Sequence, residues 1–218
     1  MYVCYSKKFT FTHVPKTAGV SIIRHLRKAV DIEMQLKEHE DFEWVYDNFL
    51  KTSKLWKNFY NFAFVRNPWD RIYSSFCYLN EGGMNFVDNR IYNLYIQPYL
   101  GDFNEFISNH KHWYKKHVHF IHMCKQKCPH FLPQHEFVSI PCKNSRMLKL
   151  DFIGRFENLR EDMLYISDKF ELALDPNELP KLNVSQREVD YRDAYDNKSI
   201  DIVANLYSTD IDIFNYTF

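Results

Sequence analysis

The chain has 218 residues, and its 28 Lys and Arg residues balance its 28 Asp and Glu residues. This length fits one globular domain, which typically extends to about 250 residues, so we expect a single domain over residues 1–218. An apolar fraction of 45%, with 19 Phe, 15 Tyr and 4 Trp, excludes a disordered or low-complexity chain.

The sequence contains no signal for a membrane or for secretion. No window approaches the roughly 20 consecutive apolar residues of a membrane helix, and residues 1–12 lack the apolar core of a secretory signal. Five cysteines spread along the chain are not typical of a disulfide-stapled domain. We therefore expect a soluble, cytoplasmic protein with no membrane span, and the sequence leaves its oligomeric state open.

The pattern of the first half predicts two strands, each followed by a helix. Residues 8–14 alternate and are rich in β-branched and aromatic side chains, which is typical of a strand, and residues 20–30 have apolar residues at helical spacing. The apolar run 62–65 is typical of a buried parallel strand. Asn67 can cap a second helix that begins at Pro68 and continues to about residue 79.

The second half repeats this alternation. Residues 151–156 predict a strand, and apolar residues at steps of four, three and four predict a helix over 159–170. Further helices are expected near 41–51, 103–122 and 197–208. Strands that alternate with helices indicate an α/β fold with a largely parallel sheet, and ligands of such folds bind at the carboxyl ends of the strands.

The loop after the first of these strands has the composition of an anion site. Gly19 permits a tight turn, the following helix offers unpaired N–H groups, and Lys16, Thr17 and Ser21 add a cation and two hydroxyls. The loop differs from the usual P-loop because GxxxxGK[ST] is absent and the lysine precedes the glycine. An ordinary strand-to-helix turn with a solvated lysine remains the alternative.

A second group of polar residues follows the apolar strand. Arg66 stands at its carboxyl end, where a guanidinium can bind phosphate oxygens through two hydrogen bonds, and Ser74 lies two turns into the next helix. Taken alone, Arg66 could be a surface charge and Ser74 a small helix residue. Together with the first loop, they predict two anion sites after two neighbouring strands.

Four segments resemble the sulfotransferases that use 3′-phosphoadenosine 5′-phosphosulfate (PAPS), especially the carbohydrate sulfotransferases and their soluble bacterial relatives. These segments are HVPKTAGVS (13–21), FVRNPWDRIYSSF (64–76), DFIGRFENL (151–159) and LYSTDIDIFNYTF (206–218). They occur in the family's order over nearly the whole chain. The resemblance implies a P-loop-kinase-like parallel sheet flanked by helices.

The resemblance also implies roles for individual residues. Lys16 would contact the bridging oxygen and the transferred sulfuryl group, and Arg66 and Ser74 would hold the 3′-phosphate. The loop that would bind the 5′-phosphosulfate consists of Pro15, Lys16, Thr17, Ala18, Gly19, Val20 and Ser21. The product would be 3′,5′-ADP. No metal is expected, because a sulfuryl group carries less charge than a γ-phosphate and one lysine with loop amides can neutralise the transition state.

A base must remove the proton of the acceptor hydroxyl. We expect it to be His39, which lies between the two phosphate motifs about where relatives carry a histidine. Its neighbours Glu38, Glu40 and Asp41 are alternatives, and a solvated histidine at the start of an acidic helix is another reading.

The stretch 106–135 is rich in histidine and lysine and has no Asp or Glu. A zinc site is conceivable there, drawn from His119, His122, Cys124, Cys128 and His130. A surface for a polyanion and a merely solvated face are the other readings. We expect no metal site, and an acceptor that is an anionic glycan.

The sequence therefore predicts an enzyme that moves the sulfuryl group of PAPS to a hydroxyl of a carbohydrate. We expect no nucleic-acid partner. Two other functions remain open. A kinase with similar anion loops would need a magnesium-binding carboxylate and a true P-loop, and a glycan-binding relative would have lost turnover.

Overall fold

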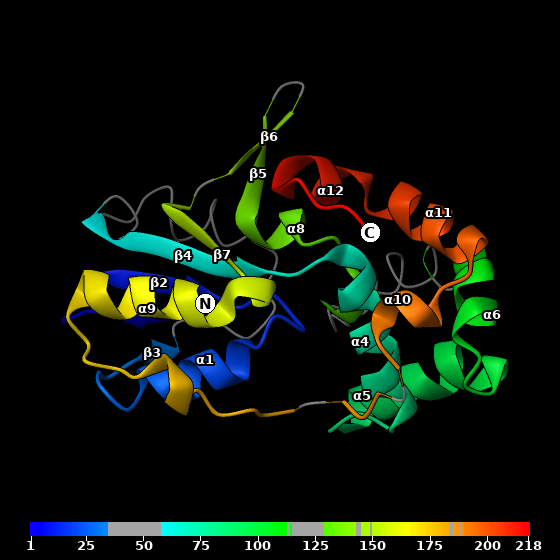
Figure 1. Cartoon of the computed structure of the whole chain (residues 1–218), viewed down its shortest axis with the longest axis horizontal. Coiled ribbons are helices and arrows are strands. Elements are labelled where there is room, and N and C mark those ends of the chain that lie inside the picture. Colours follow the sequence, from blue (N-terminus) through cyan, green and yellow to red (C-terminus); the bar gives the residue numbers. More distant parts are fainter. Residues whose placement is uncertain are drawn as a thin grey trace. The chain divides into compact units, whose positions relative to one another are not determined.

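The computed structural model describes residues 1–34, 58–112, 114, 129–142, 145–148, 150–183, 185–187 and 189–218. The chain forms two compact units, and each contains two separate segments of the sequence (Figure 1). Unit 1 comprises Met1–Arg66 and Gln134–Asn183, and unit 2 comprises Asn67–Pro133 and Val184–Phe218. The single domain expected from the length stays a prediction.

Unit 1 is built on a five-stranded sheet with the strand order β3-β1-β2-β4-β7. Strands β2, β4 and β7 are parallel, whereas β1 pairs antiparallel with both β2 and β3. The elements of unit 1 are β1 (Tyr2–Cys4), β2 (Phe9–Thr12), α1 (Gly19–Leu26), β3 (Glu33–Met34), β4 (Tyr60–Val65), α8 (His135–Val138), β5 (Ser139–Cys142), β6 (Ser145–Leu148), β7 (Phe152–Arg155), η5 (Phe156–Asn158), α9 (Leu159–Phe170) and η6 (Pro176–Glu178). The α/β class is confirmed, with a sheet that is mixed and has its parallel strands on one side.

The side chains of the sheet alternate between its two faces, and one face carries the aromatic core of unit 1. Phe11 of β2 and Phe62 of β4 pack in one cluster with apolar residues of α1 and α9, so both helices cover this face. Gly154 of β7 lies opposite Phe64 in the register, and a Cβ at this glycine would lie 2.5 Å from the Phe64 ring. The glycine therefore lets the ring pack against β7.

The described residues of unit 2 form helices joined by turns and irregular segments, without a strand. Its elements are α4 (Pro68–Asn80), α5 (Phe86–Ile91), the π-helical turn η2 (Tyr92–Ile96), η3 (Gln97–Tyr99), α6 (Phe103–Ser108), η4 (Pro129–Phe131), α10 (Tyr191–Ala194), α11 (Asn197–Leu206) and α12 (Ser208–Phe214). The Asn67 side chain accepts the Trp69 N–H at 3.1 Å, and Pro68 is the first residue of α4. The predicted start of this helix is thus confirmed.

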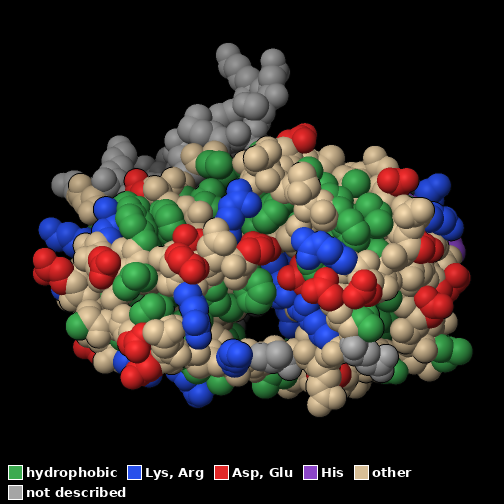
Figure 2. Space-filling model, in the orientation of Figure 1, with side chains coloured by type: hydrophobic (Ala, Val, Ile, Leu, Met, Phe, Trp, Pro, Cys, Tyr) green, Lys and Arg blue, Asp and Glu red, His purple; other side chains and the backbone are tan. Residues whose placement is uncertain are grey.

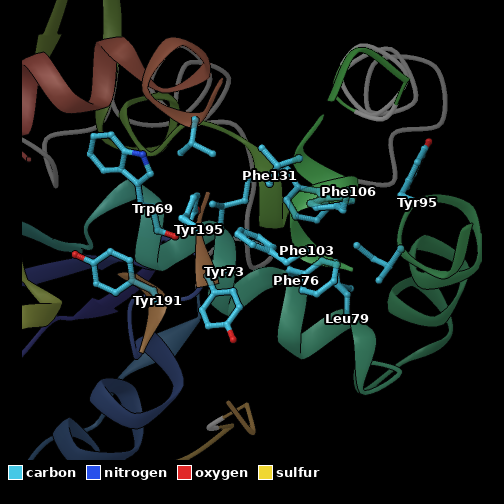
Figure 3. Close-up of a cluster of buried hydrophobic side chains, with 14 of the residues drawn as sticks. Trp69, Tyr73, Phe76, Leu79, Tyr95, Phe103, Phe106, Phe131, Tyr191 and Tyr195 are labelled. Carbon is cyan, nitrogen blue, oxygen red and sulfur yellow. The ribbon is translucent and has the colours of Figure 1, made fainter. Parts of the chain in front are cut away.

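The core of unit 2 is a cluster of aromatic side chains (Figure 3). The ring of Phe76 lies 5.2 Å from the rings of both Phe103 and Phe106, measured between centroids. The C-terminal Phe218 adds an edge contact to Trp69 at 5.7 Å, so the last residue of the chain contributes to this core.

The surface drawn in Figure 2 carries basic and acidic side chains interspersed with apolar ones. Within the described ranges, no helix combines the length and the apolar character that a bilayer crossing requires. The helix expected over 41–51 lies outside the described residues, as does most of the second half of the one expected over 103–122.

Candidate functional site

The loop between β2 and α1 has an unusual backbone. Lys16 and Ala18 both adopt left-handed conformations, with φ of 66° and 64°, whereas Thr17 between them does not. Such alternation turns successive backbone N–H groups toward one side, which makes a concavity for an anion. The Thr17 hydroxyl donates to the Val14 carbonyl at 2.8 Å and holds this shape from inside the loop.

Helix α1 begins directly after this loop. Among the described residues no side chain caps its N-terminus, and its first turn contains no acidic residue. The first N–H groups of such a helix carry partial positive charge that favours an anion. Ser21 lies in the same turn, and its Oγ accepts the Leu182 N–H at 3.2 Å, which leaves the hydroxyl proton to be donated.

The structure corrects the expected reason for Gly19. The tight turn is made by Lys16 and Ala18, and Gly19 is not among the residues with positive φ. A Cβ at Gly19 would instead lie 1.9 Å from the His13 ring. His13 is buried and stacks near Phe11, so Gly19 is required because this imidazole packs against the start of α1. The two remaining loop residues differ in exposure, since Pro15 is buried and Val20 is exposed.

Arg66 follows the last residue of β4 and is only 5% exposed. Its Nη1 donates to the Lys16 carbonyl at 3.0 Å, and its guanidinium lies 3.8 Å from the centre of the Phe156 ring. The structure thus brings together two of the predicted residues, Lys16 and Arg66, at the carboxyl ends of β2 and β4. A guanidinium carries five N–H donors in a planar fork, which suits the oxygens of an anionic ligand.

Sequence reasoning missed the residue that holds the main chain of Arg66. The side chain of Gln134 is fully buried, its Oε1 accepts the Arg66 N–H at 2.9 Å, and its Nε2 donates to the Arg66 carbonyl at 2.7 Å. The two residues are separated by 68 positions, so no local pattern could reveal the contact. A further cation, Arg155, ends β7 at the position paired with Val65.

Ser74 belongs to unit 2, where it lies buried on α4. Its hydroxyl makes no hydrogen bond to the part of the chain that the structure describes. The structure therefore joins Arg66 to the loop between β2 and α1, named the Lys16 loop from here on, but assigns Ser74 to unit 2. The expected base His39 and its alternatives Glu38, Glu40 and Asp41 lie outside the described residues.

Half of the histidine- and lysine-rich stretch 106–135 also lies outside the described residues. Among the residues that the structure describes, no group of three or more His, Cys, Asp or Glu side chains is placed to hold a metal. His130, one of the candidate zinc ligands, lies with Nε2 3.3 Å from Asp88 Oδ1. The zinc alternative therefore depends on residues 115–128.

One protein family matches the chain over nearly its whole length. No curated protein and no solved structure matches it significantly. Residues 1–217, however, match the sulfotransferase family. The chain therefore belongs to the sulfotransferase family, whose members transfer a sulfuryl group to an acceptor.

Proposed function

We propose that this protein transfers the sulfuryl group of PAPS to a hydroxyl group of a carbohydrate, with 3′,5′-ADP as the second product. The observation that carries the proposal is the hydrogen bond from Arg66 to the Lys16 carbonyl, because it joins two anion-binding elements within unit 1. PAPS carries anionic groups at both ends of its ribose, and two linked cation sites suit such a ligand.

The chemistry of the side chains fits this donor. The Lys16 loop offers backbone N–H groups, the N-terminus of α1 and the Ser21 hydroxyl, all of which can bind an anion such as the 5′-phosphosulfate. Arg66 can bind the 3′-phosphate through paired hydrogen bonds. Thr17 would contribute its main-chain N–H, because its hydroxyl already donates to Val14.

The donor supplies an electrophilic sulfur when it is bound. The acceptor oxygen forms a bond to this sulfur as the bond between sulfur and the 5′-phosphate oxygen breaks, and we propose that Lys16 neutralises the charge that develops on the leaving oxygen. His39 is the proposed base for the acceptor proton. Membership of the sulfotransferase family favours this transfer over the phosphoryl transfer of a kinase.

The proposed acceptor is an anionic glycan. Between Phe106 and His135 the sequence has five lysines and seven histidines and no Asp or Glu. A uronate-bearing or sulfated glycan would be attracted by such a segment, and the attraction would weaken with salt. The KM for an anionic acceptor should therefore rise with ionic strength, whereas a neutral best acceptor with a salt-independent KM would contradict this part of the proposal.

The cofactor assignment is tested by calorimetry with 3′,5′-ADP and 5′-AMP, which differ in the 3′-phosphate alone. The protein should prefer 3′,5′-ADP by at least about tenfold, or about 1.4 kcal/mol. Arg66→Ala should remove this preference, because it deletes the charged hydrogen-bond donors. Equal affinities in the unmodified protein would refute the assignment. Turnover with radiolabelled PAPS would then separate an enzyme from a glycan-binding relative.

A further inference from the structure

We propose that Gln134 is a positioning residue for recognition of the donor, because it holds the main chain of Arg66 and thereby fixes where the guanidinium lies. This inference rests on the proposed function, in which Arg66 binds the 3′-phosphate. It adds a residue that neither the sequence motifs nor the family match assigns.

The Gln134 side chain bonds to the Arg66 main chain in the way that a neighbouring strand would. Strand β4 ends at Val65, which pairs with Arg155 of β7, so Arg66 is the first residue beyond this pairing. The amide of Gln134 donates to the carbonyl of Arg66 and accepts from its N–H, as a neighbouring strand would do. The ladder of the sheet is thereby continued by one residue through a side chain.

Gln134 is itself fixed on a turn of the backbone. It precedes the short helix α8, and its carbonyl accepts the Phe137 N–H at 3.0 Å. Its side chain is fully buried, and both polar atoms of the amide are bonded to Arg66. Loss of either bond would leave a buried polar group of the main chain without this partner, which is costly in a protein interior.

The main chain of Arg66 determines the position of its guanidinium. The guanidinium contacts the Lys16 carbonyl and the Phe156 ring, and both contacts depend on where the Cα of Arg66 lies. A main chain that is free to move would release the arginine from the orientation that two hydrogen bonds to a phosphate require. Gln134 therefore acts on the 3′-phosphate through Arg66 and does not touch the ligand itself.

The first test is Gln134→Leu, which keeps the approximate volume and removes both hydrogen bonds. Calorimetry should show the preference for 3′,5′-ADP over 5′-AMP reduced at least about threefold relative to the unmodified protein, with 5′-AMP affinity changed less than about twofold. Ser139→Ala is the matched control. It removes a buried 2.6 Å hydrogen bond to the His135 carbonyl and leaves both hydrogen bonds between Gln134 and Arg66 in place, so it should lower the melting temperature but keep the preference.

The second test is Gln134→Glu, which serves if the leucine variant does not fold. An ionised glutamate can accept from the Arg66 N–H but repels the Arg66 carbonyl, whereas a protonated one can donate to it as Gln134 does. The preference is the ratio of the affinities for 3′,5′-ADP and 5′-AMP. At each pH, the preference of Gln134→Glu is divided by that of the unmodified protein. This quotient should rise as the pH falls from 8 to 5. A purely structural role would not produce this pH profile.

The outcomes separate this inference from the proposed function. If the unmodified protein does not prefer 3′,5′-ADP, the proposed function fails. If it does, but the folded Gln134 variants keep the full preference at every pH, Gln134 has a structural role alone and this inference is wrong. A preference that falls in Gln134→Leu and recovers with acid in Gln134→Glu supports it.

Discussion

The two units both bury polar side chains, but they use them differently. In unit 1, Gln134 and Thr17 are buried polar side chains that bond to the main chain around the candidate site, at Arg66 and Val14. In unit 2 a buried carboxylate, Asp88, connects segments of the helical core. These buried polar side chains therefore hold the main chain of the site in unit 1, whereas the buried carboxylate joins helical segments in unit 2.

The Asp88 cluster shows how this second use works. The carboxylate is 5% exposed and accepts hydrogen bonds from the Tyr78 hydroxyl at 2.7 Å and from the Asn85 side chain at 2.8 Å. His130 lies on its other oxygen at 3.3 Å. Burial alone would raise the pKa of Asp88, but the hydrogen bonds from His130 and Tyr78 outweigh it and lower the pKa to about 2. The charge is thus stabilised by partners from three segments of unit 2.

This comparison predicts that substitutions in the unit 1 loop change turnover more than stability. Lys16→Ala should lower kcat by on the order of 10³-fold, because the lysine acts on the charge of the transition state. Binding of 3′,5′-ADP, which lacks the sulfuryl group, should change much less. Lys28→Ala is the matched control, since Lys28 is an exposed lysine of the same unit paired with Glu178 at 3.0 Å, and it should keep kcat within about twofold. Equal losses in both variants would contradict the assigned role.

A second prediction concerns the base. His39→Ala should lower kcat by about 10²-fold with nearly unchanged affinity for 3′,5′-ADP, because general-base catalysis acts on the acceptor proton. Steady-state kinetics at saturating acceptor would measure this. Normal kcat in this variant would move the role to one of the neighbouring carboxylates, with Glu40→Gln and Asp41→Asn as the next variants.

The local parts of the site could be predicted from the sequence. The alternating strand, the Lys16 loop and the start of α4 at Asn67 and Pro68 depend on neighbouring residues, and the structure has all three where they were expected. The predicted extent of helix 20–30 was too long, because α1 ends at Leu26 and the backbone continues in turns. Short-range patterns thus identified the elements more accurately than their ends.

The parts that could not be predicted depend on contacts distant in sequence. Gln134 has no pattern that links it to Arg66, and the sequence suggests a tight turn as the reason for Gly19 whereas the actual constraint is the His13 ring. The antiparallel β1 and β3 are strands of three and two residues, too short for an alternating pattern to show. The division after Arg66 was also hidden, since it falls between a strand and the helix that follows it.

The last prediction tests the unit 2 side of the comparison, where stability should change more than turnover. Asp88→Asn removes the charge but keeps the shape, and it should lower the free energy of unfolding by about 2 kcal/mol near neutral pH. Tyr78→Phe is the matched control, because it deletes one donor to the same carboxylate and should cost about 1 kcal/mol. In both variants, kcat of the folded protein should stay within about twofold of the unmodified value.

The pH dependence of this effect follows from the direction of the shift. Because the pKa of Asp88 is lower in the folded chain than its ordinary value of 3.8, its charge stabilises the fold at any pH above that value. This contribution is lost as the pH falls from about 4 to 2, where the folded chain also takes up the proton. Urea unfolding of both proteins across this range should therefore show a difference in stability that is constant above about pH 5 and shrinks toward pH 2. A difference that stays the same at pH 2 would mean that Asp88 stabilises unit 2 through its shape and not through its charge, and the contrast between the two units would then lie only in where their polar groups are placed.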